Sequence, residues 1–173
     1  ACGLNLGNAT VLMPFLHNDS MLMAIERHAV RWLLGVPSLF RKILDNDRLD
    51  QYELGSLRYC FSGGAVLPDE VFRRWKTLTG SPIYQVYGAT EVGHVAYSRL
   101  DEEPQPTVIG RPLPSYRCRV AETGELLVTA DFTFKCYWNN PEETGRLFVE
   151  AGGETWYRTG DTVSVDDQGR IRF

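Results

Sequence analysis

The sequence IYQVYGATE, residues 83–91, joins an apolar strand-like run to an aromatic ring, a glycine, a hydroxyl and a carboxylate. These groups suit a nucleotide: the Tyr87 ring can lie on a base, Gly88 lets backbone approach closely, and Thr90 can hydrogen-bond a phosphate. Glu91 can share Mg²⁺ with that phosphate, because magnesium prefers oxygen ligands. A buried tyrosine ahead of a capped helix is the alternative, since Thr-Glu after a turn is also an ordinary helix start. The flanking motifs therefore decide between the two.

Composition places the chain among ordinary globular proteins. Hydrophobic residues make up 43% and charged residues 23% of the 173 positions, which is typical of a domain with a sizeable core. The net charge of −4 gives no reason to expect nucleic acid as a partner. No apolar run is long enough for a transmembrane segment and no signal peptide is recognisable, so we expect a cytoplasmic protein.

The four cysteines lie far apart, without the paired spacing of a zinc site or a disulfide framework. Cys60 and Cys136 stand in apolar runs, and we expect both to be buried as small hydrophobic residues. Unpaired thiols agree with a reducing cytoplasm.

The first hundred residues alternate apolar strand-like runs with helix-like segments. This alternation predicts an α/β fold: a partial parallel sheet with flanking helices, with Trp32 in its core. Ligands gather where the strands of such sheets end, which is where the glycines at 63 and 88 lie. Strands are expected at residues 10–15, 31–36, around Tyr59 and at 83–87; helices are expected after a cap at Asp19-Ser20, from Pro37-Ser38, and from Asp69 to Leu78.

The pattern changes after about residue 100, where prolines separate short strand-like runs. Strands at this spacing predict a small antiparallel barrel or sheet, with a short helix from Pro141 and with Tyr137 and Trp138 in its core. The expected division is residues 1–100 for part of the α/β subdomain and 101–173 for a distorted β-barrel subdomain. The expected strands are residues 116–121, 125–129, 155–158, 162–165 and 170–173.

Five short motifs follow one another in a definite order: SGGA (62–65), YGATE (87–91), GEL (124–126), YWNNP (137–141) and YRTGD (157–161). In this order they resemble the adenylate-forming (AMP-binding) superfamily of acyl-CoA synthetases, insect luciferases and the adenylation domains of peptide synthetases. The likeness covers nearly the whole chain, and five ordered motifs are far more specific than any one of them.

The resemblance implies an enzyme that joins a carboxylic acid to AMP from ATP and then transfers the acyl group to coenzyme A. ATP or AMP, Mg²⁺ and coenzyme A are the implied cofactors, and a small carboxylic acid is the implied substrate. Both chain ends look cut, which suggests an internal piece of the large N-terminal domain. The C-terminal lid domain with its catalytic lysine is then missing, so we expect the isolated piece to be inactive.

The resemblance also implies roles for individual residues. The glycine loop would bring backbone against adenine and the acyl group, Tyr87 would stack on adenine, Thr90 would bind the α-phosphate, and Glu91 would hold magnesium. Thr90 and Glu91 are thus the expected catalytic pair, and Asp161 would accept hydrogen bonds from both ribose hydroxyls. The alternatives are a loop that only turns the chain and an Asp161 that only closes a turn. The expected nucleotide-binding residues are Gly63, Gly64, Ala65, Tyr87, Gly88, Ala89, Thr90 and Asp161.

The residues around the central motif would line the acyl pocket: Val86, Val92, Gly93 and His94. Val86 stands where many members carry glycine, which narrows the pocket floor and disfavours a bulky aromatic acid. His94 is either a polar pocket residue or an ordinary exposed histidine.

Three functions remain open at this point. A fragment of an acyl-CoA synthetase is favoured by Gln85 and by the form of residues 62–68, which look more like CoA ligases. The second is an adenylation domain that loads an acyl or aminoacyl group onto a carrier protein. The third is a degenerate nucleotide-binding module without catalysis, against which the presence of Thr90, Glu91 and Asp161 counts.

Overall fold

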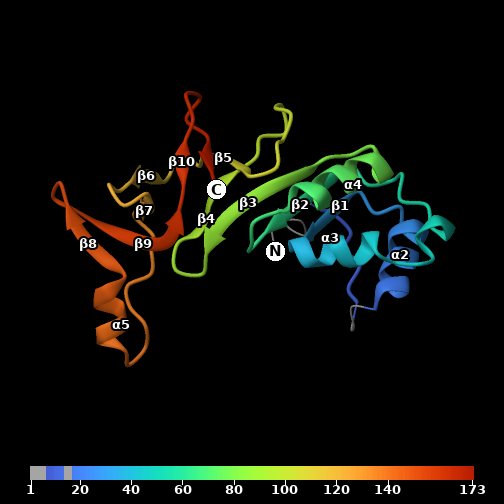
Figure 1. Cartoon of the computed structure of the whole chain (residues 1–173). Helices are drawn as coiled ribbons and strands as arrows, with labels where there is room; N and C mark the ends of the chain where they lie inside the picture. Colours follow the sequence, from blue (N-terminus) through green and yellow to red (C-terminus); the bar gives the residue numbers. More distant parts are fainter. Residues whose placement is uncertain (1–6, 14–16) are drawn as a thin grey trace.

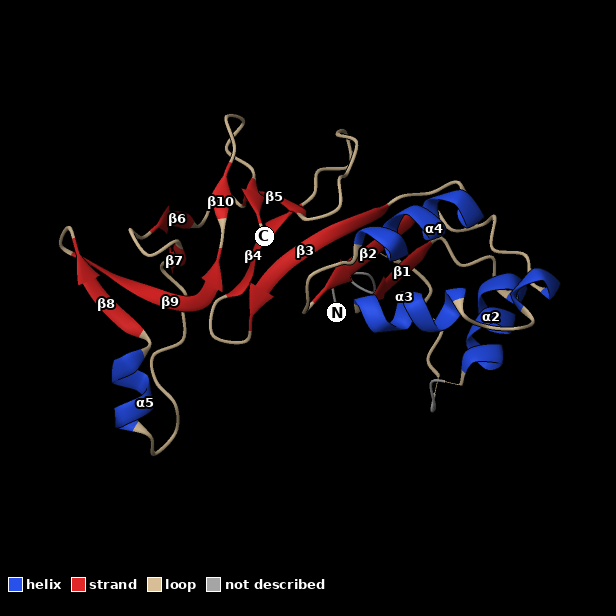
Figure 2. Cartoon of the chain, viewed as in Figure 1, coloured by secondary structure: helices blue, strands red, loops and turns tan. Residues whose placement is uncertain are grey.

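The computed structural model describes residues 7–13 and 17–173 and forms an elongated arch (Figure 1). Helices α2, α3 and α4 gather at one end, and α5 lies with a separate small sheet at the other (Figure 2). The helices are α2 (Asn18–Arg27), α3 (Pro37–Leu44), α4 (Asp69–Thr79) and α5 (Pro141–Arg146), with a 3-10 helix η1 at Leu49–Gln51. The strands are β1 (Trp32–Gly35), β2 (Tyr59–Gly63), β3 (Ile83–Ala89), β4 (Gly93–Tyr97), β5 (Val108–Pro112), β6 (Arg117–Val120), β7 (Glu125–Thr129), β8 (Phe148–Ala151), β9 (Glu154–Thr162), β10 (Ser164–Val165) and β11 (Ile171–Arg172).

Strands β1, β2 and β3 are parallel neighbours, as the alternation of strands and helices predicts. Cys60 of β2 pairs with Ile83 of β3, and both are fully buried in a core shared with α2, α3 and α4. Pro37 occupies the first turn of α3, where its missing N–H costs nothing. Gly80 ends α4 in the left-handed conformation that favours glycine.

Three local predictions at this end are wrong. Residues 10–13 form no strand, and residues 14–15 of that prediction lie outside the described residues. Helix α2 begins at Asn18 without a side-chain cap, because the Asp19 carboxylate instead accepts hydrogen bonds from Asn46 and Arg48. Trp32 is 57% exposed rather than in the core, since β1 is an edge strand.

The predicted glycine turn at Gly88 is also wrong, and so is the alternative of a helix after Tyr87. β3 continues through Gly88 to Ala89, a turn follows at residues 90–92, and β4 returns antiparallel to β3. A Cβ atom on Gly88 would lie 2.0 Å from the carbonyl oxygen of Gly93. Glycine is therefore required here by the opposite strand.

β4 turns the parallel sheet into a mixed sheet of seven strands in the order β1-β2-β3-β4-β5-β11-β10. A second sheet of four antiparallel strands has the order β6-β7-β9-β8. Both sheets are open among the described residues, so the expected closed barrel is not confirmed. Strands β4, β5 and β8 were not predicted, while β6, β7, β9, β10, β11 and α5 lie where short strands and a helix were expected, with β9 longer than predicted.

The segment between β7 and α5 is a loop, and two predictions fail there. Trp138 is 90% exposed and Cys136 is exposed, although both were expected to be buried. An apolar run buries its side chains only where an element packs on it, and no strand forms over residues 131–140. Cys60, by contrast, is fully buried as predicted.

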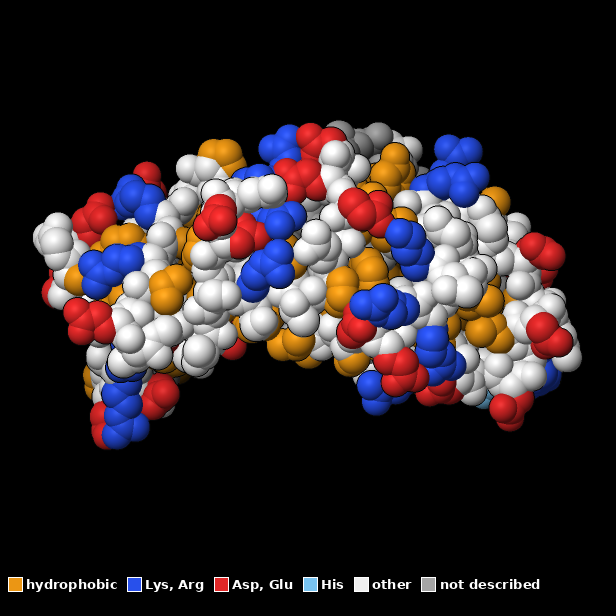
Figure 3. Space-filling view, turned by 45° about the horizontal axis from the view of Figure 1, so that its top comes forward, with side chains coloured by type: hydrophobic (Ala, Val, Ile, Leu, Met, Phe, Trp, Pro, Cys, Tyr) orange, Lys and Arg blue, Asp and Glu red, His pale blue; other side chains and the backbone are white. Residues whose placement is uncertain are grey.

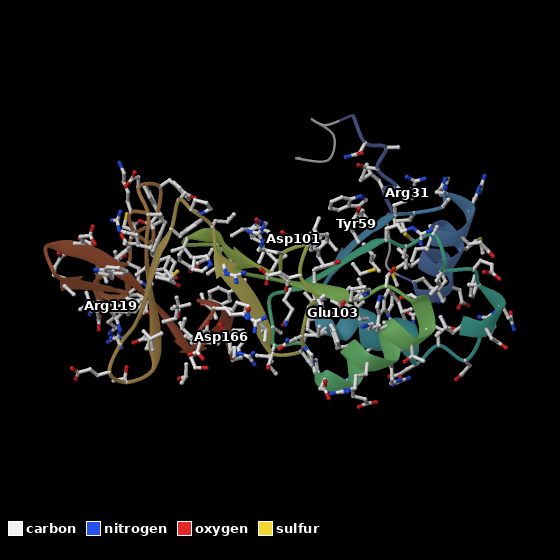
Figure 4. All side chains as sticks on the ribbon, turned by 90° about the horizontal axis from the view of Figure 1, so that it is seen from above. Arg31, Tyr59, Asp101, Glu103, Arg119 and Asp166 are labelled. Atoms are coloured by element: carbon white, nitrogen blue, oxygen red, sulfur yellow. The ribbon has the colours of Figure 1, made fainter. Side chains whose placement is uncertain are left out.

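Two hydrophobic cores lie along the arch. The first is built from α2, α3, α4 and the parallel strands, and the second from β4, β5, β7, β9 and β11. β3 belongs to both, because Ile83 is buried in the first core and Tyr87 in the second. Figure 4 shows Arg119 of β6 near the end with the four-stranded sheet and Tyr59 of β2 within the half with the parallel strands. The outline of the molecule is concave between the two halves (Figure 3).

No helix in the described part of the chain combines the length and the apolar character that a membrane crossing requires.

Candidate functional site

The hydroxyl of Tyr87 donates a hydrogen bond to Oδ2 of Asp161 at 2.7 Å. Tyr87 stands near the end of β3 and Asp161 near the end of β9, 74 positions later in the chain. The ring is 9% exposed and packs edge-on against Phe173 at 5.8 Å between centroids. Burial raises the pKa of the Tyr87 phenol, so it remains a protonated donor to the carboxylate. Two of the five motifs, YGATE and YRTGD, thus meet directly.

Glu91 lies in the turn between β3 and β4 and is held by the loop between β7 and α5. The hydroxyl of Tyr137 donates a hydrogen bond to Oε1 of Glu91, and the backbone N–H of Phe134 donates to the Glu91 carbonyl at 2.8 Å. The hydrogen bond of the Tyr137 hydroxyl to the Glu91 carboxylate, and to a smaller degree burial, raises the pKa of Tyr137 to about 12. Tyr157 of β9 is buried, and its burial, followed by the charges of Glu91 and Asp161, raises its pKa.

The glycine loop at Gly63 and Gly64 lines a cleft of about 720 Å³. The cleft lies between the ends of β1, β2 and β3 and the helices α2 and α3. Its walls are more apolar than polar, with Lys42 of α3, Asn18 of α2 and His94 of β4 among the polar side chains that reach it. Of the residues expected at the site, Gly63, Gly64, Val86, Gly88 and His94 line this cleft.

The other expected residues are not among those that line this cleft. Val92 is 2% exposed in the second core, where its carbonyl accepts a hydrogen bond from Tyr116 at 2.5 Å. Gly93 and Ala65 are exposed, Thr90 is exposed in the turn, and Ala89 ends β3 half-buried. The structure thus brings Gly63, Val86 and His94 into one cleft and joins Tyr87 to Asp161, while Glu91 is bonded to the loop between β7 and α5.

Glu91 has the chemistry of a magnesium ligand that works together with substrate. Only Oε1 of its carboxylate has a hydrogen-bond partner among the described residues, which leaves Oε2 for a cation. No group of three or more His, Cys, Asp or Glu side chains that could cage a metal occurs in the described ranges. One carboxylate oxygen fits Mg²⁺, because this ion keeps waters and substrate phosphates in its shell.

Tyr137 is the residue at this site that the sequence did not reveal. Tyr-Trp ahead of Asn-Asn-Pro predicts buried aromatic residues, and no local pattern tells which of the two rings turns inward. Its contact with Glu91 spans 46 positions and joins the turn after β3 to the loop after β7. A pairing of residue types across that distance could have been inferred only from many related sequences.

Known proteins share both sequence and structure with this chain. The family model described as "AMP-binding enzyme" matches residues 1–138. The long-chain-fatty-acid–CoA ligase of Bacillus subtilis is 29% identical over 96% of this chain and 31% of its own length. The benzoate–CoA ligase of Thauera aromatica is 33% identical over 95% of this chain and 34% of its own length. The crystal structure of ATP-bound MatB from Rhodopseudomonas palustris superposes with a TM-score of 0.85 at 28% identity, over 98% of this chain and 35% of that one. The chain spans about a third of the length of these relatives.

Proposed function

Because the chain belongs to the AMP-binding enzyme family, we propose that it forms the nucleotide-holding part of an ATP-dependent ligase, which converts a carboxylic acid into an acyl-adenylate and then into an acyl-CoA thioester. The relatives named above as CoA ligases support this acceptor. The single observation that carries the proposal is the hydrogen bond between Tyr87 and Asp161, which joins two motifs 74 positions apart in the chain.

The proposed roles follow from where each group lies. Oδ1 of Asp161 has no partner among the described residues, so it can accept from a ribose hydroxyl while Oδ2 holds Tyr87. Thr90 is exposed beside Glu91 and can donate to the α-phosphate. Glu91 would hold Mg²⁺, which lowers the charge repulsion on the phosphates when bound. The adenine base of ATP would meet the ring of Tyr87 and the backbone of the loop at Gly63 and Gly64.

The reaction then needs two displacements. A carboxylate oxygen of the acid attacks the α-phosphorus, the bond to the β-phosphate oxygen breaks, and pyrophosphate leaves. The sulfur of coenzyme A, after losing its proton to a base or solvent, attacks the acyl carbon, and AMP leaves with the bonding electrons. The chain contributes positioning and charge stabilisation to these steps.

The acid would enter the cleft that Val86 and His94 line. Val86 projects from β3 next to the glycine loop: a Cβ atom on Gly63 would lie 3.7 Å from Cβ of Val86. We therefore expect acids narrower than a substituted aromatic ring. A lid domain elsewhere in the protein would complete the catalytic groups. The boundary between the two subdomains would lie near residue 100. The unpaired Cys60, Cys118 and Cys136 agree with a cytoplasmic location.

The test is carboxylate-dependent exchange of labelled pyrophosphate into ATP by the full-length protein, over a panel of aliphatic and aromatic acids. We expect exchange with small or linear acids and thioester formation with coenzyme A. Transfer to a carrier protein instead would contradict the coenzyme A acceptor. Absence of exchange with every acid, together with absence of ATP binding, would overturn the proposal.

A further inference from the structure

We infer that Tyr137 is a positioning residue for Glu91: its hydroxyl fixes the carboxylate so that one oxygen faces the nucleotide's metal-bridged phosphates. The inference rests on the proposed function and adds to it a residue from the four-stranded side of the molecule. No expectation from the sequence assigns Tyr137 this role.

The contact is specific to one group on each side. Tyr137 is half-buried, and its hydroxyl donates to Oε1 of Glu91. Phe134, three positions earlier, donates its backbone N–H to the carbonyl of the same Glu91 at 2.8 Å. The loop therefore holds Glu91 at both its backbone and its side chain, and the carboxylate cannot rotate without losing one of these contacts.

The loop is itself held in place from two directions. The N–H of Tyr137 donates to Oγ1 of Thr144 at 3.0 Å, and that hydroxyl donates to the carbonyl of Asn140 at 2.7 Å. The Asn140 side chain accepts from the N–H of Glu143 at 3.2 Å and caps α5. Tyr137 is thus tied to the start of α5.

Aromatic packing supplies the second anchor. The Phe134 ring lies 5.1 Å from that of Tyr137, 5.4 Å from Phe148 of β8 and 6.0 Å from Tyr157 of β9. Phe148 and Tyr157 are cross-strand partners in the four-stranded sheet. The support of Glu91 therefore extends from the turn after β3, through the loop, to the sheet that also carries Asp161.

The chemistry of the pair suits a metal ligand. A donor on one carboxylate oxygen orients the group and leaves the second oxygen to the cation, as hydrogen-bonded partners of metal ligands commonly do.

The experiment measures equilibrium binding of ATP to the full-length protein at increasing Mg²⁺, by calorimetry, so that no turnover is needed. Tyr137→Phe keeps the ring and removes only the hydroxyl. We expect the Mg²⁺ concentration for half-maximal ATP binding to rise about tenfold, while ATP binding without Mg²⁺ stays at the wild-type level. In a Glu91→Gln background, Tyr137→Phe should add no further change.

Tyr116→Phe is the matched control. Tyr116 also donates its hydroxyl to the turn after β3, at the carbonyl of Val92, but does not contact the Glu91 carboxylate. We expect a lower Tm for this variant and an unchanged Mg²⁺ requirement.

The outcomes separate the two claims. Wild-type protein that binds no ATP at any Mg²⁺ concentration would overturn the proposed function. Wild-type protein that binds ATP, with Tyr137→Phe needing no more Mg²⁺, would overturn the role of Tyr137 alone. An equal rise in Tyr116→Phe would also overturn it, because the effect would then come from a loosened turn.

Discussion

Tyr87 and Asp161 are the residues on which the site depends most directly. Each has an ordinary local explanation, a strand tyrosine and a turn aspartate, until the hydrogen bond between them is seen. A buried phenol needs a partner for its O–H, and here the partner is a carboxylate that keeps a second oxygen for a ligand. Under the proposed function, one contact would therefore serve both packing and binding.

Tyr87→Phe tests this double role. Removing the hydroxyl keeps the ring in its core and should lower the free energy of unfolding by about 1.5–3 kcal/mol, as for other hydrogen bonds to charged groups. Asp161 then loses its orientation, so ATP affinity should fall several-fold. Urea denaturation and calorimetric ATP titration measure the two effects; wild-type ATP affinity would contradict the proposed place of Asp161 at the sugar.

At the scale of elements, the hairpin of β3 and β4 places Glu91. The two strands approach so closely at Gly88 that a side chain there would meet the Gly93 backbone at 2.0 Å. A bulge in the pairing between Tyr87 and Gly88 accompanies this approach, and bulges re-aim the residues beside them. The turn that carries Thr90 and Glu91 is thereby aimed toward the four-stranded sheet.

Gly88→Ala should disturb this hairpin. The added methyl group meets backbone rather than a flexible side chain, so β4 must shift, at a cost of about 3 kcal/mol in the free energy of unfolding. Thermal unfolding measures it. Gly145→Ala in α5 is the control, since nothing lies within 4 Å of its added Cβ, and it should be neutral or slightly stabilising. Equal Tm values for the two variants would be inconsistent with the close approach.

On the scale of the whole molecule, β3 connects two cores that would otherwise be separate. Ile83 and Tyr87 lie four positions apart on this strand and are buried in different clusters. The seven-stranded sheet also takes strands from both halves of the chain. Loss of packing in one core should therefore destabilise the other core as well.

Phe40→Ala provides the test. Phe40 is fully buried and packs edge-on against Trp75 at 4.9 Å, so its removal should cost about 3–5 kcal/mol. Hydrogen exchange should then show faster exchange of backbone amides in β7 and β9 as well as in β2. Protection that is lost in β2 alone would mean that the two cores unfold independently.

The sequence by itself determined the family, the alternation of strands and helices through β3, and the residue types that a nucleotide site needs. These features are local, because short stretches of sequence determine them. Examples are the helix starts at Pro37 and Asp69 and the glycine after β2. The order of the motifs adds information, because each loop can be recognised from its own residues without knowing how the rest of the chain folds.

Only the tertiary structure decided which of these residues meet. The turn at Thr90 rather than Gly88, the exposure of Trp32 and Trp138, and the contact of Tyr137 with Glu91 all depend on strand partners far away in the chain. Antiparallel pairing with β4 keeps Gly88 extended, an edge position leaves Trp32 in solvent, and the absence of a strand over residues 131–140 leaves Trp138 outside while Tyr137 turns inward. Burial and pairing are set by distant neighbours, which short-range patterns do not contain.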